Sequence, residues 1–193
     1  MSEPGLLDKV LLLHAGLDAG GVPHAFGGAL ALAFHVEQPR GTADIDVNIS
    51  LPVSRAAEAL RALPPDVTWD SATVLTIERD GQVRLWWGRT PLDLFFPQHL
   101  LHQVLAGRTV SMPLGEGVVP VLSATDLTIF KALFDRTKDW ADIEEMVTFG
   151  SPDVPEALAW LEAIVGADDA RVAKLRAVRP PGLDPTWQSV TDR

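Results

Sequence analysis

The stretch that decides the fold is Thr-Ala-Asp-Ile-Asp-Val-Asn-Ile, which spans residues 42–49. Apolar and polar residues alternate along it, and this alternation predicts a short β-strand over residues 44–49. Side chains two positions apart on a strand point to the same face, so we expect Asp44 and Asp46 to lie side by side. Neighbouring carboxylates repel each other unless a cation lies between them. The pair therefore indicates a metal-binding strand or, as the alternative, a solvated strand end or turn.

A glycine pair, Gly27-Gly28, precedes this strand in the sequence. Glycine lets the backbone approach a phosphate without a Cβ clash. The helix expected over residues 29–35 would direct its first N–H groups at the same anion. Arg40 and Thr42 lie in the following loop, where they are placed to contact phosphate oxygens. The alternatives are an ordinary tight turn and a solvated arginine.

Asp93 is the candidate for a third acid at this site. It is the one charged residue in the apolar run 91–96, which predicts a further strand. An unpaired carboxylate in such a strand would be costly to desolvate. If the two strands are neighbours, three carboxylates converge and can hold one or two Mg²⁺ ions. Asp93 is also placed to accept the proton of an attacking hydroxyl.

The rest of the pattern predicts a mixed α/β half followed by an all-helical half. Helices are expected over residues 6–19, 29–35, 54–63, 99–106, 123–134, 138–149, 151–165 and 169–178. Further strands are expected over residues 23–26, 72–78 and 83–87, and an extended segment over residues 109–121. Asp80-Gly81 is interpreted as the hairpin turn between two of these strands.

This pattern divides the chain into an α/β (α+β) core over residues 1–121, a helical part over 122–179, and a flexible tail over 180–193. The length of 193 residues and the 47% hydrophobic content suit one domain with a small appendage. The absence of cysteine excludes disulfides and cysteine-based zinc sites. No apolar run is long enough to cross a bilayer. We therefore expect a cytoplasmic protein with no membrane partner.

The segment around Lys131 offers a second group of charged side chains. On one helix, two pairs of residues four apart, Lys131–Asp135 and Lys138–Asp142, would form ordinary ion pairs. The functional alternative has Lys131 neutralising a triphosphate, with Arg136 and Asp139 beside it. Residue spacing alone leaves both interpretations open.

Four segments, in this order, resemble the AbiEii-like nucleotidyltransferases of the polymerase-beta-like superfamily, which include the MenT toxins. They are Gly27-Gly-Ala-Leu30, Arg40-Gly-Thr-Ala-Asp-Ile-Asp46, Asp93, and Lys131-Ala-Leu-Phe-Asp-Arg-Thr-Lys-Asp-Trp-Ala-Asp142. The resemblance implies a nucleotidyltransferase-type mixed β-sheet with flanking helices and a C-terminal helical bundle. It also implies Mg²⁺ as cofactor and an NTP as substrate.

The resemblance assigns a role to each matching position. The acids Asp44, Asp46 and Asp93 would bind the metal and, with Lys131, form the catalytic set. The nucleotide-side residues would be Gly27, Gly28, Arg40, Thr42, Lys131, Arg136 and Asp139. One departure matters, because Ala29 occupies a place where many relatives carry Ser or Thr. A side-chain hydroxyl that would contact a phosphate is therefore missing.

The activity implied is transfer of NMP from an NTP to an acceptor hydroxyl, with release of pyrophosphate. Toxin-type relatives imply the tRNA 3′ end as acceptor and a cognate antitoxin as partner. The net charge of −10 argues against a long RNA-binding track, and it suits a cationic small molecule such as an aminoglycoside. A non-catalytic nucleotide-binding protein on the same scaffold is a third interpretation, prompted by Ala29. A glycosyltransferase with an Asp-x-Asp metal site is a fourth.

Overall fold

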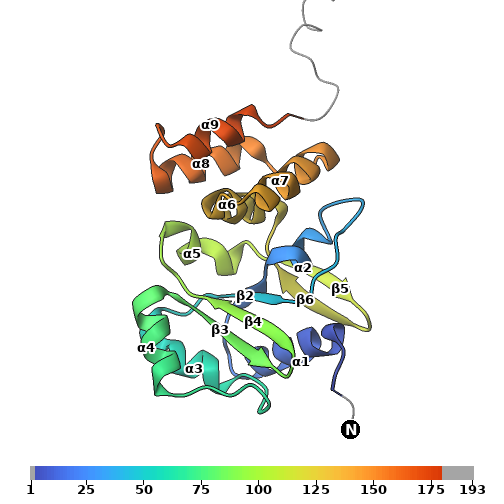
Figure 1. Ribbon diagram of the computed structural model, residues 1–193, viewed down its shortest axis with the longest axis vertical. Coiled ribbons are helices and arrows are strands. Elements are labelled where there is room, and N and C mark those ends of the chain that lie inside the picture. The colour runs from blue at the N-terminus through green and yellow to red at the C-terminus, as the bar shows by residue number, and fades with distance from the viewer. Residues whose placement is uncertain (1–2, 180–193) are drawn as a thin grey trace, which may run out of the picture. The chain divides into compact units, whose positions relative to one another are not determined.

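The computed structural model describes residues 3–179 (Figure 1), so the tail expected over residues 180–193 lies outside the described residues. The chain forms two compact units. The first, called here the α/β unit, contains residues 3–34 and 38–123 of the described chain. The second, called the helical unit, contains residues 35–37 and 124–179 of the described chain.

The α/β unit contains both helices and strands. Its elements are α1 (Leu6–Ala19), β1 (His24–Phe26), α2 (Gly28–Leu32), β2 (Ile45–Ile49), the 3₁₀ turn η1 (Val53–Arg55), α3 (Ala56–Arg61), α4 (Ser71–Asp80), β3 (Gln82–Trp87), β4 (Thr90–Phe95), α5 (Leu100–Val104), the 3₁₀ turn η2 (Leu105–Gly107), β5 (Val110–Leu114) and β6 (Gly117–Val121).

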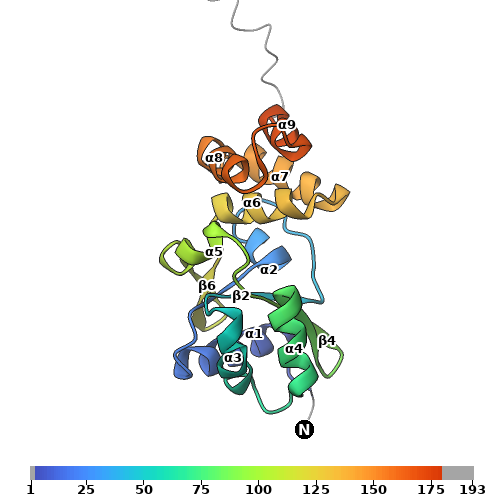
Figure 2. The same ribbon diagram turned by 90° about the vertical axis from the view of Figure 1, so that its left-hand side faces the viewer.

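These strands form a mixed sheet in the order β3-β4-β2-β1-β6-β5. The β2/β4 and β1/β6 pairs are parallel, and the other pairs are antiparallel. Helices α1, α3 and α4 cover one face of the sheet, and α2 and α5 lie on the other (Figure 1 and Figure 2). The prediction of a mixed α/β fold with flanking helices is confirmed.

The two faces of β2 differ in character. His24 of β1 is the register partner of Ile49, and its Nε2 lies 3.0 Å from Nδ1 of His14 in α1. Val47 and Ile49 therefore project toward α1, where both are fully buried. Side chains alternate along a strand, so Asp46 projects to the opposite face, the one that carries α2.

The expected strand over residues 72–78 is wrong, because this segment belongs to helix α4. Asp70 caps the helix by accepting a hydrogen bond from the backbone N–H of Thr73 at 2.9 Å. Gly81 ends it in the left-handed conformation, with φ 66°. The β-branched residues of the segment favour a strand, but the two caps favour the helix. The hairpin turn accordingly lies at Gly88-Arg89, between β3 and β4, and not at residues 80–81.

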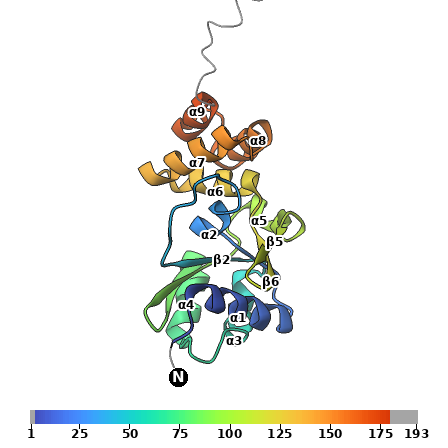
Figure 3. The same cartoon turned by 90° about the vertical axis from the view of Figure 1, so that its right-hand side faces the viewer.

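The helical unit contains α6 (Ala124–Phe134), α7 (Thr137–Phe149), α8 (Val154–Val165) and α9 (Ala170–Ala177) (Figure 3). The chain breaks between α6 and α7 at Asp135, whose φ is 54°. Gly150 ends α7, and Asp153 caps α8 through the backbone N–H of Glu156 at 2.9 Å. The predicted C-terminal helical bundle is confirmed. Among the described residues, none of the helices is long and apolar enough to span a membrane.

Candidate functional site

The sheet places the predicted acids at neighbouring positions. Asp46 of β2 and Asp93 of β4 are register partners in the parallel pair. Aligned residues on adjacent strands project to the same face, so both carboxylates lie on the face that carries α2. Asp44 immediately precedes β2 and is two residues from Asp46. All three side chains are partly exposed.

The glycine turn lies directly against Asp46. The backbone N–H of Gly27 donates to the carbonyl of Asp46 at 2.9 Å. Gly28 has φ +55°, and a Cβ atom built on it would lie 1.8 Å from Asp46 Oδ2. A glycine is therefore required at position 28 both by the backbone conformation and by the space that Asp46 occupies. The turn expected to bind phosphate and the acid expected to bind metal are in contact.

Arg84 is a site residue that the sequence pattern did not reveal. It is the register partner of Asp93 across the β3–β4 hairpin. Its guanidinium donates from Nε to Asp93 Oδ1 at 2.8 Å and from Nη2 to Oδ2 at 2.6 Å. This bidentate pairing with Asp93 raises the pKa of Arg84, and the nearby charges of Asp44 and Asp46 raise it further. Arg84 is thus a counter-cation of the acidic group.

A metal ion shared by the three acids would require Asp93 as a ligand. Within residues 3–179, no three acidic or histidine side chains are gathered as closely as a metal site requires. Asp93 is turned toward Arg84, which bonds both of its oxygens. An all-carboxylate donor set has the chemistry that Mg²⁺ prefers. The three carboxylates are therefore the right type of ligand for such an ion. In this side-chain arrangement, however, Asp93 is paired with Arg84 and does not join Asp44 and Asp46 as a third ligand.

Thr42 and Arg40, the two loop residues expected to contact phosphate, differ in their surroundings. Thr42 forms a local turn, since its Oγ1 lies 3.3 Å from the backbone N–H of Asp44 and 3.2 Å from the Asp44 carbonyl. Its hydroxyl is therefore engaged in directing the chain into β2. Arg40 lies on the same loop, with an exposed side chain.

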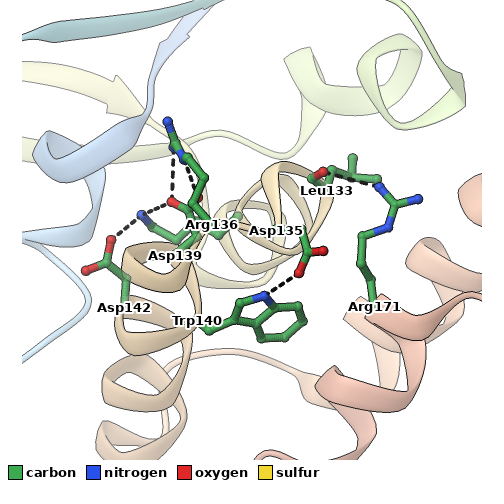
Figure 4. Close-up of polar contacts among 8 residues, drawn as sticks. Leu133, Asp135, Arg136, Asp139, Trp140, Asp142 and Arg171 are labelled. Atoms are coloured by element: carbon green, nitrogen blue, oxygen red, sulfur yellow. Dashed lines mark hydrogen bonds and ion pairs between the residues drawn. The ribbon is translucent and has the colours of Figure 1, made fainter.

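In the helical unit, Lys131 is a buried cation between α6 and α7. It is 4% exposed, donates to Asp142 Oδ2 at 2.5 Å, and lies 3.6 Å from Asp139. Arg136 donates two hydrogen bonds to the buried Asp139, at 2.5 and 3.1 Å (Figure 4). These four side chains balance two positive and two negative charges.

Of the two interpretations of Lys131, the ion pair with Asp135 is not formed in the structure. The left-handed backbone at Asp135 ends α6 and turns its carboxylate away from the helix face of Lys131. Asp135 accepts instead from Trp140 Nε1 and Lys174 Nζ, each at 2.7 Å (Figure 4 shows the first contact). Lys131 therefore ties α6 to α7, and its role toward a nucleotide stays a prediction.

Comparison with known proteins bears on the fold. No protein-family model and no curated protein matches the sequence. Among solved structures, the chain is similar to an antigenic nucleotidyltransferase-like protein from Paracoccidioides brasiliensis, with 18% identity, a TM-score of 0.54, and coverage of 91% of this chain and 94% of that one. It is also similar to ANT(2'')-Ia in complex with adenylyl-2''-tobramycin, with 16% identity, a TM-score of 0.50, and coverage of 89% and 94%. The chain therefore has the nucleotidyltransferase fold, and the narrower resemblance to AbiEii-like proteins stays a prediction.

Proposed function

We propose that this protein is a Mg²⁺-dependent nucleotidyltransferase that moves NMP from an NTP to a hydroxyl of a small cationic acceptor. The observation that carries the proposal is the pairing of Asp46 with Asp93 on adjacent parallel strands, with Gly28 packed against Asp46. An acidic pair beside a glycine turn suits a metal ion and the phosphates that it accompanies.

Asp44 and Asp46 would hold the metal ion, and Asp93 would supply the third carboxylate. When bound, a divalent ion neutralises charge on the phosphate oxygens and orients them. In the transfer, the acceptor oxygen bonds to the α-phosphorus, the bond from that phosphorus to the bridging oxygen breaks, and pyrophosphate leaves with the electron pair. Asp93 accepts the proton of the acceptor hydroxyl.

The turn and the loop before β2 serve the phosphates in this proposal. Gly27 and Gly28 offer backbone that lies close to the acidic group, and Arg40 offers an exposed cation on the same stretch of chain. Thr42 supports the site by shaping the approach to β2. Lys131, Arg136 and Asp139 of the helical unit are candidates for nucleotide binding, and their variants test that role separately.

The choice of a cationic acceptor follows from charge. The chain carries 26 acidic and 16 basic residues, a balance that attracts cations and weakens binding to RNA. One of the similar proteins, ANT(2'')-Ia, was solved in complex with adenylyl-2''-tobramycin. The tRNA acceptor and antitoxin partner implied by the sequence resemblance are the alternative within the same activity.

Two assays test the proposal. In the first, melting temperature is measured with each NTP and Mg²⁺. We expect a rise for the wild type and for Asp80→Asn, a control that removes an exposed carboxylate of α4. Asp46→Asn should abolish the rise. If no NTP raises the melting temperature, or if Asp46→Asn leaves the rise unchanged, the proposed site is wrong.

In the second assay, α-labelled NTPs are incubated with a panel of aminoglycosides and with total RNA. Label on an aminoglycoside, lost in Asp46→Asn, supports the proposal in full. Label on RNA alone would mean that the proposed acceptor is wrong and that the proposed nucleotidyl transfer is right. Binding without transfer favours a non-catalytic nucleotide-binding protein. The buried Ala29, which lacks a hydroxyl for phosphate, is the observation behind that second candidate.

A further inference from the structure

Arg84 forms an ion pair with Asp93, one of the three acids of the candidate site. It lies on β3, an edge strand of the sheet, and the hairpin register places it directly opposite Asp93. Its planar fork matches the carboxylate, and both carboxylate oxygens accept a hydrogen bond from it. Bidentate pairs of this kind are the stronger class of ion pair and fix the orientation of both groups.

The two partners differ in their freedom to move. The side chain of Arg84 is 52% exposed, whereas that of Asp93 is 16% exposed. The long arginine side chain can therefore swing into solvent without disturbing the sheet, while Asp93 stays on β4. The contact can open from the arginine side alone.

Arg84 also interacts with the acids that it does not touch. Asp44 and Asp46 both add attraction for its positive charge. A guanidinium in this position lowers the repulsion among three neighbouring carboxylates, which is the task that a metal ion would otherwise perform. Two cations at the same oxygens would repel each other, so the arginine and a divalent ion compete.

We propose that Arg84 is a built-in competitor of the divalent ion: it holds Asp93 when the metal is absent and must release it before Asp93 can bind the metal. This inference rests on the proposed function, because it assumes that the acidic group is a metal site. It explains why the donor set has the right chemistry and yet is not gathered into a metal site among the described residues. Arg84 is a positioning residue, since it acts through Asp93.

The test measures Mn²⁺ affinity by calorimetric titration without nucleotide, so the readout does not depend on activity. Arg84→Gln should bind Mn²⁺ about tenfold more tightly than the wild type, a change of about 1.4 kcal/mol. Arg79→Gln is the matched control, because it removes the same charge from an exposed ion pair with Asp80 on α4. Its Mn²⁺ affinity should stay within about twofold of wild type.

A second variant separates competition at Asp93 from a general effect of charge. In the background Asp93→Asn, the further change Arg84→Gln should tighten Mn²⁺ binding by much less than tenfold, because the contested carboxylate is gone and only the longer-range effect of the charge on Asp44 and Asp46 remains. Melting temperatures of all variants confirm that each is folded.

The possible outcomes separate failure of this inference from failure of the proposed function. If the wild type binds Mn²⁺ and Arg84→Gln binds no more tightly, the inference is wrong and the proposed function stands. If the full gain persists in the Asp93→Asn background, competition at Asp93 is likewise wrong. If neither the wild type nor Arg84→Gln binds Mn²⁺, both the inference and the proposed metal site are overturned.

Discussion

The change Gly28→Ala tests the contact between the glycine turn and Asp46. Position 28 has φ +55°, and an L-residue in this region costs about 1–2 kcal/mol. The new Cβ would also lie 1.8 Å from Asp46 Oδ2 and 2.6 Å from its carboxyl carbon. Asp46 must therefore leave its rotamer, which adds about 0.5–1.5 kcal/mol. We expect a total loss of about 2–3 kcal/mol in the free energy of unfolding.

Gly21→Ala is the matched control for the backbone term. Gly21 has φ +62°, but a Cβ atom built there meets nothing within 4 Å. This variant should lose only the conformational part, about 1–2 kcal/mol. The difference between the two losses isolates the displacement of Asp46.

Urea unfolding and Mn²⁺ titration together measure the effect. Gly28→Ala should weaken Mn²⁺ binding about tenfold or more, because a displaced Asp46 no longer presents its oxygens to the ion. Gly21→Ala should leave Mn²⁺ affinity unchanged. Equal losses of stability in the two variants, with unchanged Mn²⁺ affinity in both, would refute the argument that the turn seats Asp46.

Two further predictions concern buried charged and titratable groups. Lys131→Met leaves the buried acids Asp139 and Asp142 without their shared cation, so we expect a loss of about 3–5 kcal/mol by urea unfolding. The control Lys138→Met removes an exposed lysine of the same segment and should change stability by less than about 0.5 kcal/mol, and equal losses would contradict a structural role for Lys131. Burial, and to a lesser degree His99, lowers the pKa of His102 from 6.5 to about 4. The unfolded chain then binds the proton first as the pH falls, so stability should decline between about pH 6.5 and 4, by about 3 kcal/mol, and His102→Gln should make the decline shallower. An unchanged pH profile in that variant would assign the decline to other groups.

The central part of the site can be predicted from the sequence because local patterns decide it. Alternation over residues 44–49 indicates β2, and the structure begins that strand at Ile45. The lone charge of Asp93 in an apolar run indicates a strand next to other acids, and Asp46 and Asp93 are register partners. A charged residue among apolar neighbours is informative because its burial requires a partner.

The role of Arg84 cannot be predicted in the same way, because it depends on register and register depends on the position of the turn. Threonine, valine and isoleucine within residues 72–78 resemble a strand, and this places the hairpin at residues 80–81. The caps Asp70 and Gly81 are present in the sequence as helix boundaries, and they carry the decisive signal. With the turn at 88–89, position 84 faces position 93.

The ion pairs of Lys131 require a different kind of information. Spacing on one continuous helix leads to Asp135, but the chain leaves the helical conformation at that residue. A left-handed aspartate has no reliable sequence signature outside a turn motif. The partners of Lys131 are consequently Asp142 and Asp139, from the next helix.

The two-residue turn between β3 and β4 has a consequence for how such a site changes over evolutionary time. Side chains alternate along β3, so a one-residue insertion at Gly88-Arg89 that shifts the pairing would bring Val83 or Leu85 opposite Asp93. An apolar neighbour would leave the acid without its guanidinium, although no residue of the acidic group had been substituted. The length of this turn therefore determines whether an arginine faces Asp93. Relatives with a different turn length would differ in their affinity for a divalent ion even if they share all three carboxylates.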